Sequence, residues 1–326
     1  MNIIHQNNYP NVIVFTHGDM DGIFSAMAIK YRYDNNLLSD AWDRNVHCYI
    51  CGYSEMYKDL NWFKERVEES FIPEQENIVF MTDYAIQPND TMVQFWNWLT
   101  DKGCKFYWID HHITAIQNLK HLNIPGNQNS KNSGCLNTWE FLTNFDPEKK
   151  SPMCIRYAND FDIWNKNSEY SWEKQLYPLC YFIESLGSDL NNNSGELVQT
   201  CYEMFQDNGF TDKCIGIGKF IWKFVLNKYQ NANKKIHSFL WNDYKCLCIN
   251  SSWPGSTQFE QHEEFSDADL LISWSFNGKT YQYGLYSTKP NIHVGDIAKF
   301  YLNGGGHKGA AGGETKEFIF YKLLSN

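Results

Sequence analysis

The sequence lacks several features that define large classes of proteins. No run approaches the roughly 18 apolar residues of a membrane-spanning helix, and the first residues carry neither the basic nor the apolar stretch of a secretory signal. Positive charge is scarce, since 28 Lys and Arg stand against 38 Asp and Glu, a formal net charge of −10. We therefore expect a soluble cytoplasmic protein that binds neither membranes nor long duplex nucleic acid, which normally requires a basic surface.

Patterns typical of disulfide frameworks, zinc sites and P-loops are also missing. The ten cysteines are scattered along the chain. Cys48 and Cys51 have the spacing of half a zinc site, but the next close pair, Cys246 and Cys248, is distant and separated by one residue. Buried free thiols are the preferred interpretation. The glycine-rich tail lacks the Gly-x4-Gly-Lys-Ser/Thr pattern of a P-loop.

What the sequence does contain is a regular alternation of strand and helix signals in its first half. Short apolar runs without polar alternation indicate strands buried on both faces, as parallel sheets require. Such strands are predicted at residues 12–15, 46–53, 78–81 and 105–109, and helices at about 22–32, 60–70 and 91–102 and after Ser133. The fold class predicted is a doubly wound, mainly parallel α/β domain.

The second half has a different pattern. The alternation fades after Trp164; a segment at 170–186 is predicted helical, and a long helix is predicted at 212–236. Strands are predicted at 244–249, 270–276 and 280–286, and Asn277-Gly278 indicates a two-residue hairpin. The expected organisation is an α/β domain at 1–186, a helical connector at 187–236 and a smaller α+β domain at 237–326, with the active site in the cleft between the two domains.

Acidic and imidazole side chains follow three of the predicted strands. Ligands of open parallel sheets bind beyond the carboxyl ends of the strands. The residues concerned are His17, Asp19 and Asp21 after the first strand, Asp83 after the third, and Asp110, His111 and His112 after the fourth. One such Asp alone would favour a helix N-cap. Several together favour two Mn²⁺ or Mg²⁺ ions, because buried carboxylates repel without cations and paired ions can clamp a phosphoryl group.

The glycine run at 304–306, followed by His307 and Lys308, has a different explanation. Consecutive glycines let backbone N–H groups approach a phosphate or carboxylate closely. A flexible turn would produce the same composition, so the run alone does not distinguish the two.

Taken together, these motifs resemble those of the DHH phosphoesterase superfamily with its DHH-associated C-terminal domain. The resemblance rests on four motifs in the family order: Thr16-His17-Gly18-Asp19-Met20-Asp21-Gly22, Asp83, Asp110-His111-His112, and Gly-Gly-Gly-His-x-x-Ala-Ala-Gly at 304–312. The tight His-x-Asp-x-Asp-Gly form is most similar to the nanoRNase (oligoribonuclease) and cyclic-nucleotide phosphodiesterase branch. RecJ-type exonucleases and manganese-dependent pyrophosphatases are more distant.

The resemblance implies a set of metal ligands. His17, Asp19 and Asp83 would hold one ion, and Asp21, Asp83 and His111 the other, with Asp83 bridging. A further acid lies in the stretch 160–164, where Asp162 is favoured and Asp160 is the alternative.

It also implies roles for residues outside this ligand set. His112 would contact the scissile phosphate and Asp110 would orient the site. Gly305, Gly306 and His307 would bind the other end of the substrate. Tyr286 stands where relatives often have a phosphate-binding Arg. Lys289 would then supply the charge, or Tyr286 would stack on a base.

The function expected from these residues is divalent-metal-dependent phosphodiester hydrolysis, with Mn²⁺ preferred and Mg²⁺ or Co²⁺ as alternatives. The substrates would be short single-stranded oligonucleotides or cyclic or linear dinucleotides. A RecJ-like single-stranded DNA exonuclease and a nucleotide-binding module without hydrolysis are the alternatives. The sequence is compatible with a homodimer and does not fix the oligomeric state.

Overall fold

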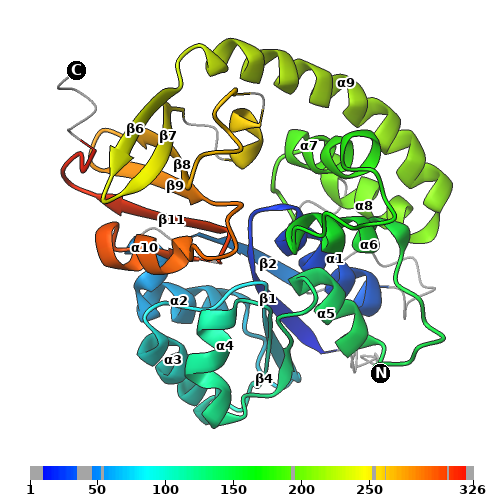
Figure 1. The fold of residues 1–326 in the computed structure, drawn as a ribbon. Helices are drawn as coiled ribbons and strands as arrows, with labels where there is room; N and C mark the ends of the chain where they lie inside the picture. Colours follow the sequence, from blue (N-terminus) through cyan, green and yellow to red (C-terminus); the bar gives the residue numbers. More distant parts are fainter. Residues whose placement is uncertain are drawn as a thin grey trace, which may run out of the picture. The chain divides into compact units, whose positions relative to one another are not determined.

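The computed structural model describes residues 10–34, 46–52, 55–191, 195–251, 255–260, 262–306 and 308–320. The chain divides into two compact units, Met1–Ile221 and Trp222–Asn326 (Figure 1). Helix α9 (Asn208–Asn233) crosses the boundary between them.

The first unit is built on a sheet of five strands in the order β2-β1-β3-β4-β5, all paired in parallel. The strands are β1 (Asn11–His17), β2 (Val46–Cys51), β3 (Asn77–Thr82), β4 (Lys105–Asp110) and β5 (Gly126–Gln128). The four predicted strands and the parallel α/β class are confirmed. Strand β5 was not predicted, because its three residues, Gly, Asn and Gln, carry no apolar signal.

Alternate residues of each buried strand pack on opposite faces of the sheet. Ile13 and Phe15 belong to the core on one face, and Val12 and Val14 to the core on the other. The first face is covered by α2 (Leu60–Ser70), α3 (Asn89–Asp101) and α4 (Ile113–Leu119), and the second by α1 (Met20–Asp34), α5 (Gly134–Leu142), α6 (Met153–Asp162), α7 (Tyr177–Ser185) and α8 (Glu196–Gln206) (Figure 1). Burial on both faces explains the unbroken apolar runs in the sequence.

Several predicted helix boundaries are confirmed. Ser133 caps α5, where its hydroxyl accepts a hydrogen bond from Leu136 N–H at 3.4 Å. Gly103 follows α3 with a φ of +76°, the conformation expected of a C-terminal glycine. Helix α9 begins at Asn208, earlier than the predicted residue 212, because Asp207 accepts the Gly209 N–H at 2.7 Å and caps the first turn.

Short helical turns complete the helical segments. They lie at Glu55–Lys58, Lys120–Leu122 and Ser256–Phe259, with a π-helical turn at Trp172–Leu176 before α7. No helix in the described parts of the chain is both long enough and apolar enough to cross a membrane. All ten cysteines are buried thiols, as expected.

The second unit contains a mixed six-stranded sheet in the order β10-β11-β9-β8-β7-β6. Its elements are β6 (His237–Trp241), β7 (Tyr244–Asn250), β8 (Leu270–Phe276), β9 (Tyr281–Tyr286), α10 (Val294–Tyr301), β10 (Gly305–Gly306) and β11 (Ala310–Thr315). The hairpin between β8 and β9 is confirmed, but its position is corrected by one residue. Asn277 pairs with Thr280 through backbone and side-chain hydrogen bonds, so Gly278 and Lys279 form the loop.

The glycine run of the tail is part of this sheet rather than a free loop. Gly305 and Gly306 pair with Gly312 and Ala311. A Cβ at Gly304 would lie 1.9 Å from the Gly312 carbonyl oxygen, so the close approach of two backbones accounts for this glycine. Strand signals are weak in such a segment because it has almost no side chains to bury.

Candidate metal centre

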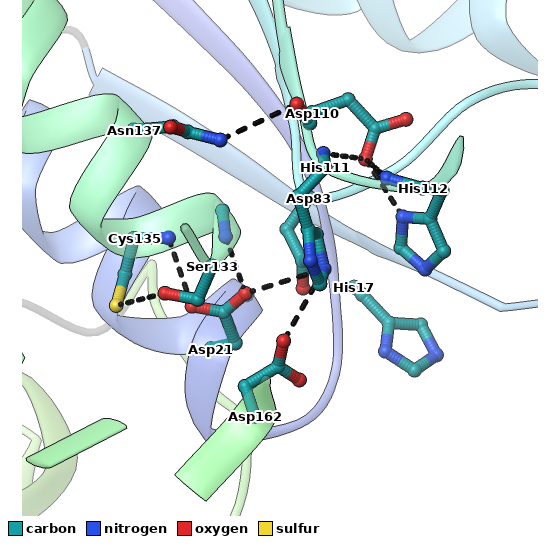
Figure 2. Close-up of polar contacts among 12 residues, drawn as sticks. His17, Asp21, Asp83, Asp110, His111, His112, Ser133, Cys135, Asn137 and Asp162 are labelled. Atoms are coloured by element: carbon teal, nitrogen blue, oxygen red, sulfur yellow. Dashed lines mark hydrogen bonds and ion pairs between the residues drawn. The ribbon is translucent and has the colours of Figure 1, made fainter. Parts of the chain in front are cut away.

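The carboxyl ends of β1, β3 and β4 bring acid and imidazole groups to one edge of the sheet. Parallel pairing of neighbouring strands places these ends side by side. Asp21 comes from the first turn of α1, Asp83 follows β3, and His111 follows β4 (Figure 2). Asp162, the last residue of α6, points toward the same group.

Asp83 is 2% exposed. Its φ of +51° lies in the left-handed region, which Asp and Asn adopt more readily than most residues. Its N–H donates to the Ile109 carbonyl at 2.9 Å, which ties it to β4. A Cβ at Gly134 would lie 2.6 Å from the Cβ of Asp83, so only glycine fits beside this carboxylate.

The first residues of α5 hold the carboxylate of Asp21. Gly134 N–H donates to Oδ2 at 2.6 Å and Cys135 N–H donates to Oδ1 at 2.8 Å. A helix N-terminus favours a negative charge at this position. Gly134 therefore supports two acids at once. The sequence predicts the Ser133 cap but not the role of Gly134, which depends on the positions of Asp21 and Asp83 beside it.

His111 lies at the centre of the cluster. Its Nε2 is 3.1 Å from Asp83 Oδ1, 3.4 Å from Asp162 Oδ2 and 3.7 Å from Asp21 Oδ2. The Oδ2 atom of Asp162 is buried and makes no hydrogen bond in the described residues, and its contact with His111 is an ion pair only. A buried carboxylate oxygen without a hydrogen bond is costly, and a cation in front of it would offset that cost.

His17 and Asp19 form a second arm of the cluster. His17 Nδ1 lies 2.8 Å from Asp19 Oδ2, and Asp19 Oδ1 accepts the Gly22 N–H at 3.0 Å. A Cβ at Gly22 would lie 2.2 Å from the His17 carbonyl oxygen. Glycine at this position therefore allows the tight loop that turns Asp19 and Asp21 toward the sheet.

Asp110 and His112 form a paired unit. Asp110 Oδ1 lies 2.7 Å from His112 Nδ1 and accepts the N–H groups of His111 and His112. Burial acts to raise the pKa of Asp110, but attraction to His112 and its hydrogen bonds outweigh burial and lower it. Asp110 is therefore ionised and fixes the orientation of the His112 ring.

The pKa values of the acids diverge. Burial, followed by repulsion from Asp21 and Asp19, raises the pKa of both Asp83 and Asp162 well above the ordinary value. At Asp19 the attraction of His17 outweighs burial and lowers the pKa, and the same pair raises the pKa of His17 despite its burial. A site with more carboxylates than it can keep ionised is suited to binding cations.

Among the residues that the structure describes, three groups of side chains have ligand atoms within 4.8 Å of one another. They are His17, Asp19 and Asp83; Asp83, His111 and His112; and Asp21, His111 and Asp162. Asp83 and His111 each belong to two groups. Carboxylate oxygens with imidazole nitrogens are donors suited to Mn²⁺ and Mg²⁺, so the residues fit a divalent ion.

Asp160 is placed differently. Its carboxylate accepts hydrogen bonds from the Ser168 hydroxyl and the Asn159 amide. It is in none of the three groups, whereas Asp162, the favoured alternative, is in one.

The predicted substrate-binding residues belong to the second unit. Gly305 and Gly306 form β10, and His307 lies outside the described residues. Lys289 Nζ donates to the Ser266 carbonyl at 2.6 Å. The Tyr286 hydroxyl accepts the Gly255 N–H at 2.7 Å, and burial raises the pKa of this phenol. The Tyr286 hydroxyl is thus engaged within its own unit.

Comparison with known proteins reveals a similarity in fold. No family model and no curated protein matches the chain. Among solved structures, a DHH domain described as belonging to a family of ribosomal proteins is 14% identical, covers 97% of this chain and 84% of its own, and has a TM-score of 0.60.

Two further solved structures have lower TM-scores. An exopolyphosphatase-related protein from Bacteroides fragilis is 13% identical over 97% of this chain and 90% of its own, with a TM-score of 0.52. The exonuclease RecJ bound to manganese is 14% identical over 98% of this chain and 89% of its own, with a TM-score of 0.50. The chain therefore has the fold of DHH-domain proteins, a parallel α/β unit followed by a mixed-sheet unit.

Proposed function

We propose that the chain is a divalent-metal-dependent phosphodiesterase that hydrolyses short single-stranded oligonucleotides or cyclic or linear dinucleotides. The observation that carries the proposal is the sharing of Asp83 and His111 between overlapping groups of metal-binding side chains. Shared ligands are what two neighbouring ions require. Buried carboxylates that raise one another's pKa supply the negative charge that would attract the ions.

The proposed ligands come from two of the three groups. His17, Asp19 and Asp83 would hold one ion, and Asp21, His111 and Asp162 the other, with Asp83 next to both; His112, from the third group, is assigned to the substrate. Asp160 is not proposed as a ligand, because its carboxylate is engaged by Ser168. Bound divalent ions supply Lewis acidity and lower the pKa of a coordinated water toward neutrality.

The remaining roles, orienting the substrate and holding the ligands, belong to groups of the protein itself. Asp110 contacts Nδ1 of His112, so Nε2 is the ring nitrogen that we assign to the substrate phosphate. In this position His112 hydrogen-bonds an oxygen that gains negative charge as the phosphodiester bond breaks. Gly134 and Cys135 keep the carboxylate of Asp21 in place throughout.

Two observations support the proposed substrate and metal: one concerns phosphate and manganese, and the other the length of the substrate. The structurally similar proteins include an exopolyphosphatase-related protein and an exonuclease bound to manganese. The net charge of −10 disfavours long nucleic acid, which favours short substrates. In the second unit, Gly305, Gly306 and Lys289 are proposed as phosphate-binding residues.

The test is hydrolysis of a substrate panel by the full chain with Mn²⁺ and with EDTA. The panel contains a cyclic dinucleotide, a linear dinucleotide, a five-mer and a long single strand. We expect Mn²⁺-dependent cleavage that is fastest on the shorter substrates. Rates that rise with length would favour the exonuclease instead, and tight binding without products would favour a binding module.

A further inference from the structure

Two tryptophans and a lysine form a compact cluster directly after Asp162. Lys166 Nζ lies 3.7 Å from the ring centroid of Trp164 and 3.7 Å from that of Trp172. The two indoles are 4.7 Å apart at an angle of 67°, so they form a corner with the ammonium group in it. We refer to Trp164, Lys166 and Trp172 as the aromatic corner.

The aromatic corner is held by several contacts. Trp164 has a φ of +55°, an uncommon conformation for a bulky residue, and its N–H donates to the Phe161 carbonyl at 3.2 Å. The Trp172 indole N–H donates to the Asn165 carbonyl at 3.0 Å, and its ring packs against Tyr177 at 5.3 Å. A backbone strained in this way is typical of segments that position a functional side chain.

Burial does not explain the position of Trp164. Its side chain is 39% exposed, and Lys166 is also exposed. A fixed, exposed indole next to a lysine is the pattern of single-strand nucleic-acid binding surfaces, where bases stack on aromatic rings and cations hold the backbone. The lysine already fills the cation position of the corner, so a free cation is not the expected ligand.

The aromatic corner lies beside the candidate metal centre along the chain. Trp164 is two residues after Asp162, whose carboxylate oxygen is 3.4 Å from His111 Nε2. Two peptide units span at most about 7.6 Å between Cα atoms. The aromatic corner therefore begins within this distance of a candidate metal ligand, and this proximity along the chain is the basis for assigning both to the same substrate.

We propose that the exposed indole of Trp164 is a stacking surface for a substrate nucleobase and that Lys166 binds the adjoining phosphate. This inference rests on the proposed function for the identity of the ligand. It adds a base-recognition site in the first unit. Stacking does not depend on base identity, so the site would accept any of the four bases.

The test uses the Mn²⁺-loaded full chain and two non-hydrolysable ligands. One is a linear diadenylate with a phosphonate in place of the scissile phosphodiester, and the other is the same compound without bases. We expect Trp164→Ala to weaken binding of the diadenylate about tenfold, the effect of losing one stacked base, and to leave binding of the abasic ligand unchanged. Trp164→Phe should restore most of the affinity, and Lys166→Gln should weaken both ligands.

The matched control is Trp98→Ala. Trp98 also contacts lysines, with Lys102 Nζ at 5.0 Å and Lys64 Nζ at 5.5 Å from its ring. It lies near the end of α3, which leads into the first residue of β4 and so places it at the opposite edge of the sheet. Trp98→Ala should change the affinity for neither ligand.

The inference is overturned if Trp164→Ala leaves diadenylate affinity unchanged, or weakens both ligands equally as a general loss of structure would. Failure of the proposed function gives a different result. In that case the wild-type chain cleaves nothing in the substrate panel, while Trp164 still distinguishes the diadenylate from its abasic counterpart.

Discussion

Replacing Asp83 with Asn separates a metal centre from a purely structural cluster. The substitution keeps the volume of the side chain, and Asn tolerates the φ of +51° at this position. It removes one negative charge from a group in which the ligand atoms of His17, Asp19 and Asp83 lie within 4.8 Å of one another. Two charges at that separation repel by ~3.5 kcal/mol at an effective dielectric constant of about 20.

That figure is an upper limit for the gain in stability, because Asp83 takes up a proton when its pKa is raised. We expect Asp83→Asn to stabilise the metal-free protein by about 1–3 kcal/mol. For a unit of this size each kcal/mol corresponds to a rise in Tm of roughly 2–4 °C. Mn²⁺ at a hundred times its Kd should stabilise the wild-type protein by ~2.7 kcal/mol, and this stabilisation should disappear in the variant.

The assay is thermal unfolding of both proteins, each with EDTA and with Mn²⁺. The expected pattern is a higher Tm for the variant in EDTA and a Tm that responds to Mn²⁺ only in the wild type. A lower Tm for the variant in EDTA, together with an unchanged response to Mn²⁺, would show that Asp83 stabilises the fold directly and is not a metal ligand.

The remaining predictions concern pH, packing and turnover. The pKa of Asp83 is raised in the folded state, so the folded state binds more protons than the unfolded state. The free energy of unfolding of the metal-free protein should therefore fall by up to about 1.4 kcal/mol per pH unit as pH rises above roughly 4. Unfolding curves from pH 5 to 8 would show this decline, and saturating Mn²⁺ should reduce it. Gly134→Ala should weaken Mn²⁺ binding by about tenfold or more, since a Cβ there displaces Asp83. In the control Gly216→Ala the new Cβ meets no atom within 4 Å, and calorimetric titration should give the wild-type affinity. Asp110→Asn should lower kcat about a hundredfold or more, because it disturbs the orientation of His112, and should change Mn²⁺ affinity little. Equal losses in kcat and in Mn²⁺ affinity would assign Asp110 to metal binding instead.

The sequence predicts the parallel sheet well because its strands are buried on both faces. Runs such as Val12 to Phe15 have no polar residue to interrupt them, and each ends at the edge where the acids begin. The same rule cannot find β5, where Gly126 approaches β4 so closely that a Cβ would lie 1.8 Å from the Trp108 carbonyl oxygen. Backbone contact of this kind leaves no apolar pattern.

The acids of the candidate site can be predicted because they lie at the ends of predicted strands. The residues that hold these acids in place cannot be predicted in this way. Asp110 is recognisable because it directly follows an apolar run, and Asp83 because it follows another one after a single threonine. Gly134 acts through an absent side chain and a backbone N–H, so its role becomes visible only when Asp21 and Asp83 are seen on either side of it. Trp164 is of a residue type common in cores, and its exposure sets it apart from the other tryptophans in the described ranges.

The central claim is that the crowded carboxylates at the edge of the sheet are neutralised by two divalent ions. Crystals grown with Mn²⁺ and measured at the manganese absorption edge test it directly. We expect two anomalous peaks about 3.5–4 Å apart, with Asp83 next to both. Absence of manganese at Asp83 and His111, with the carboxylates turned apart into solvent, would contradict it.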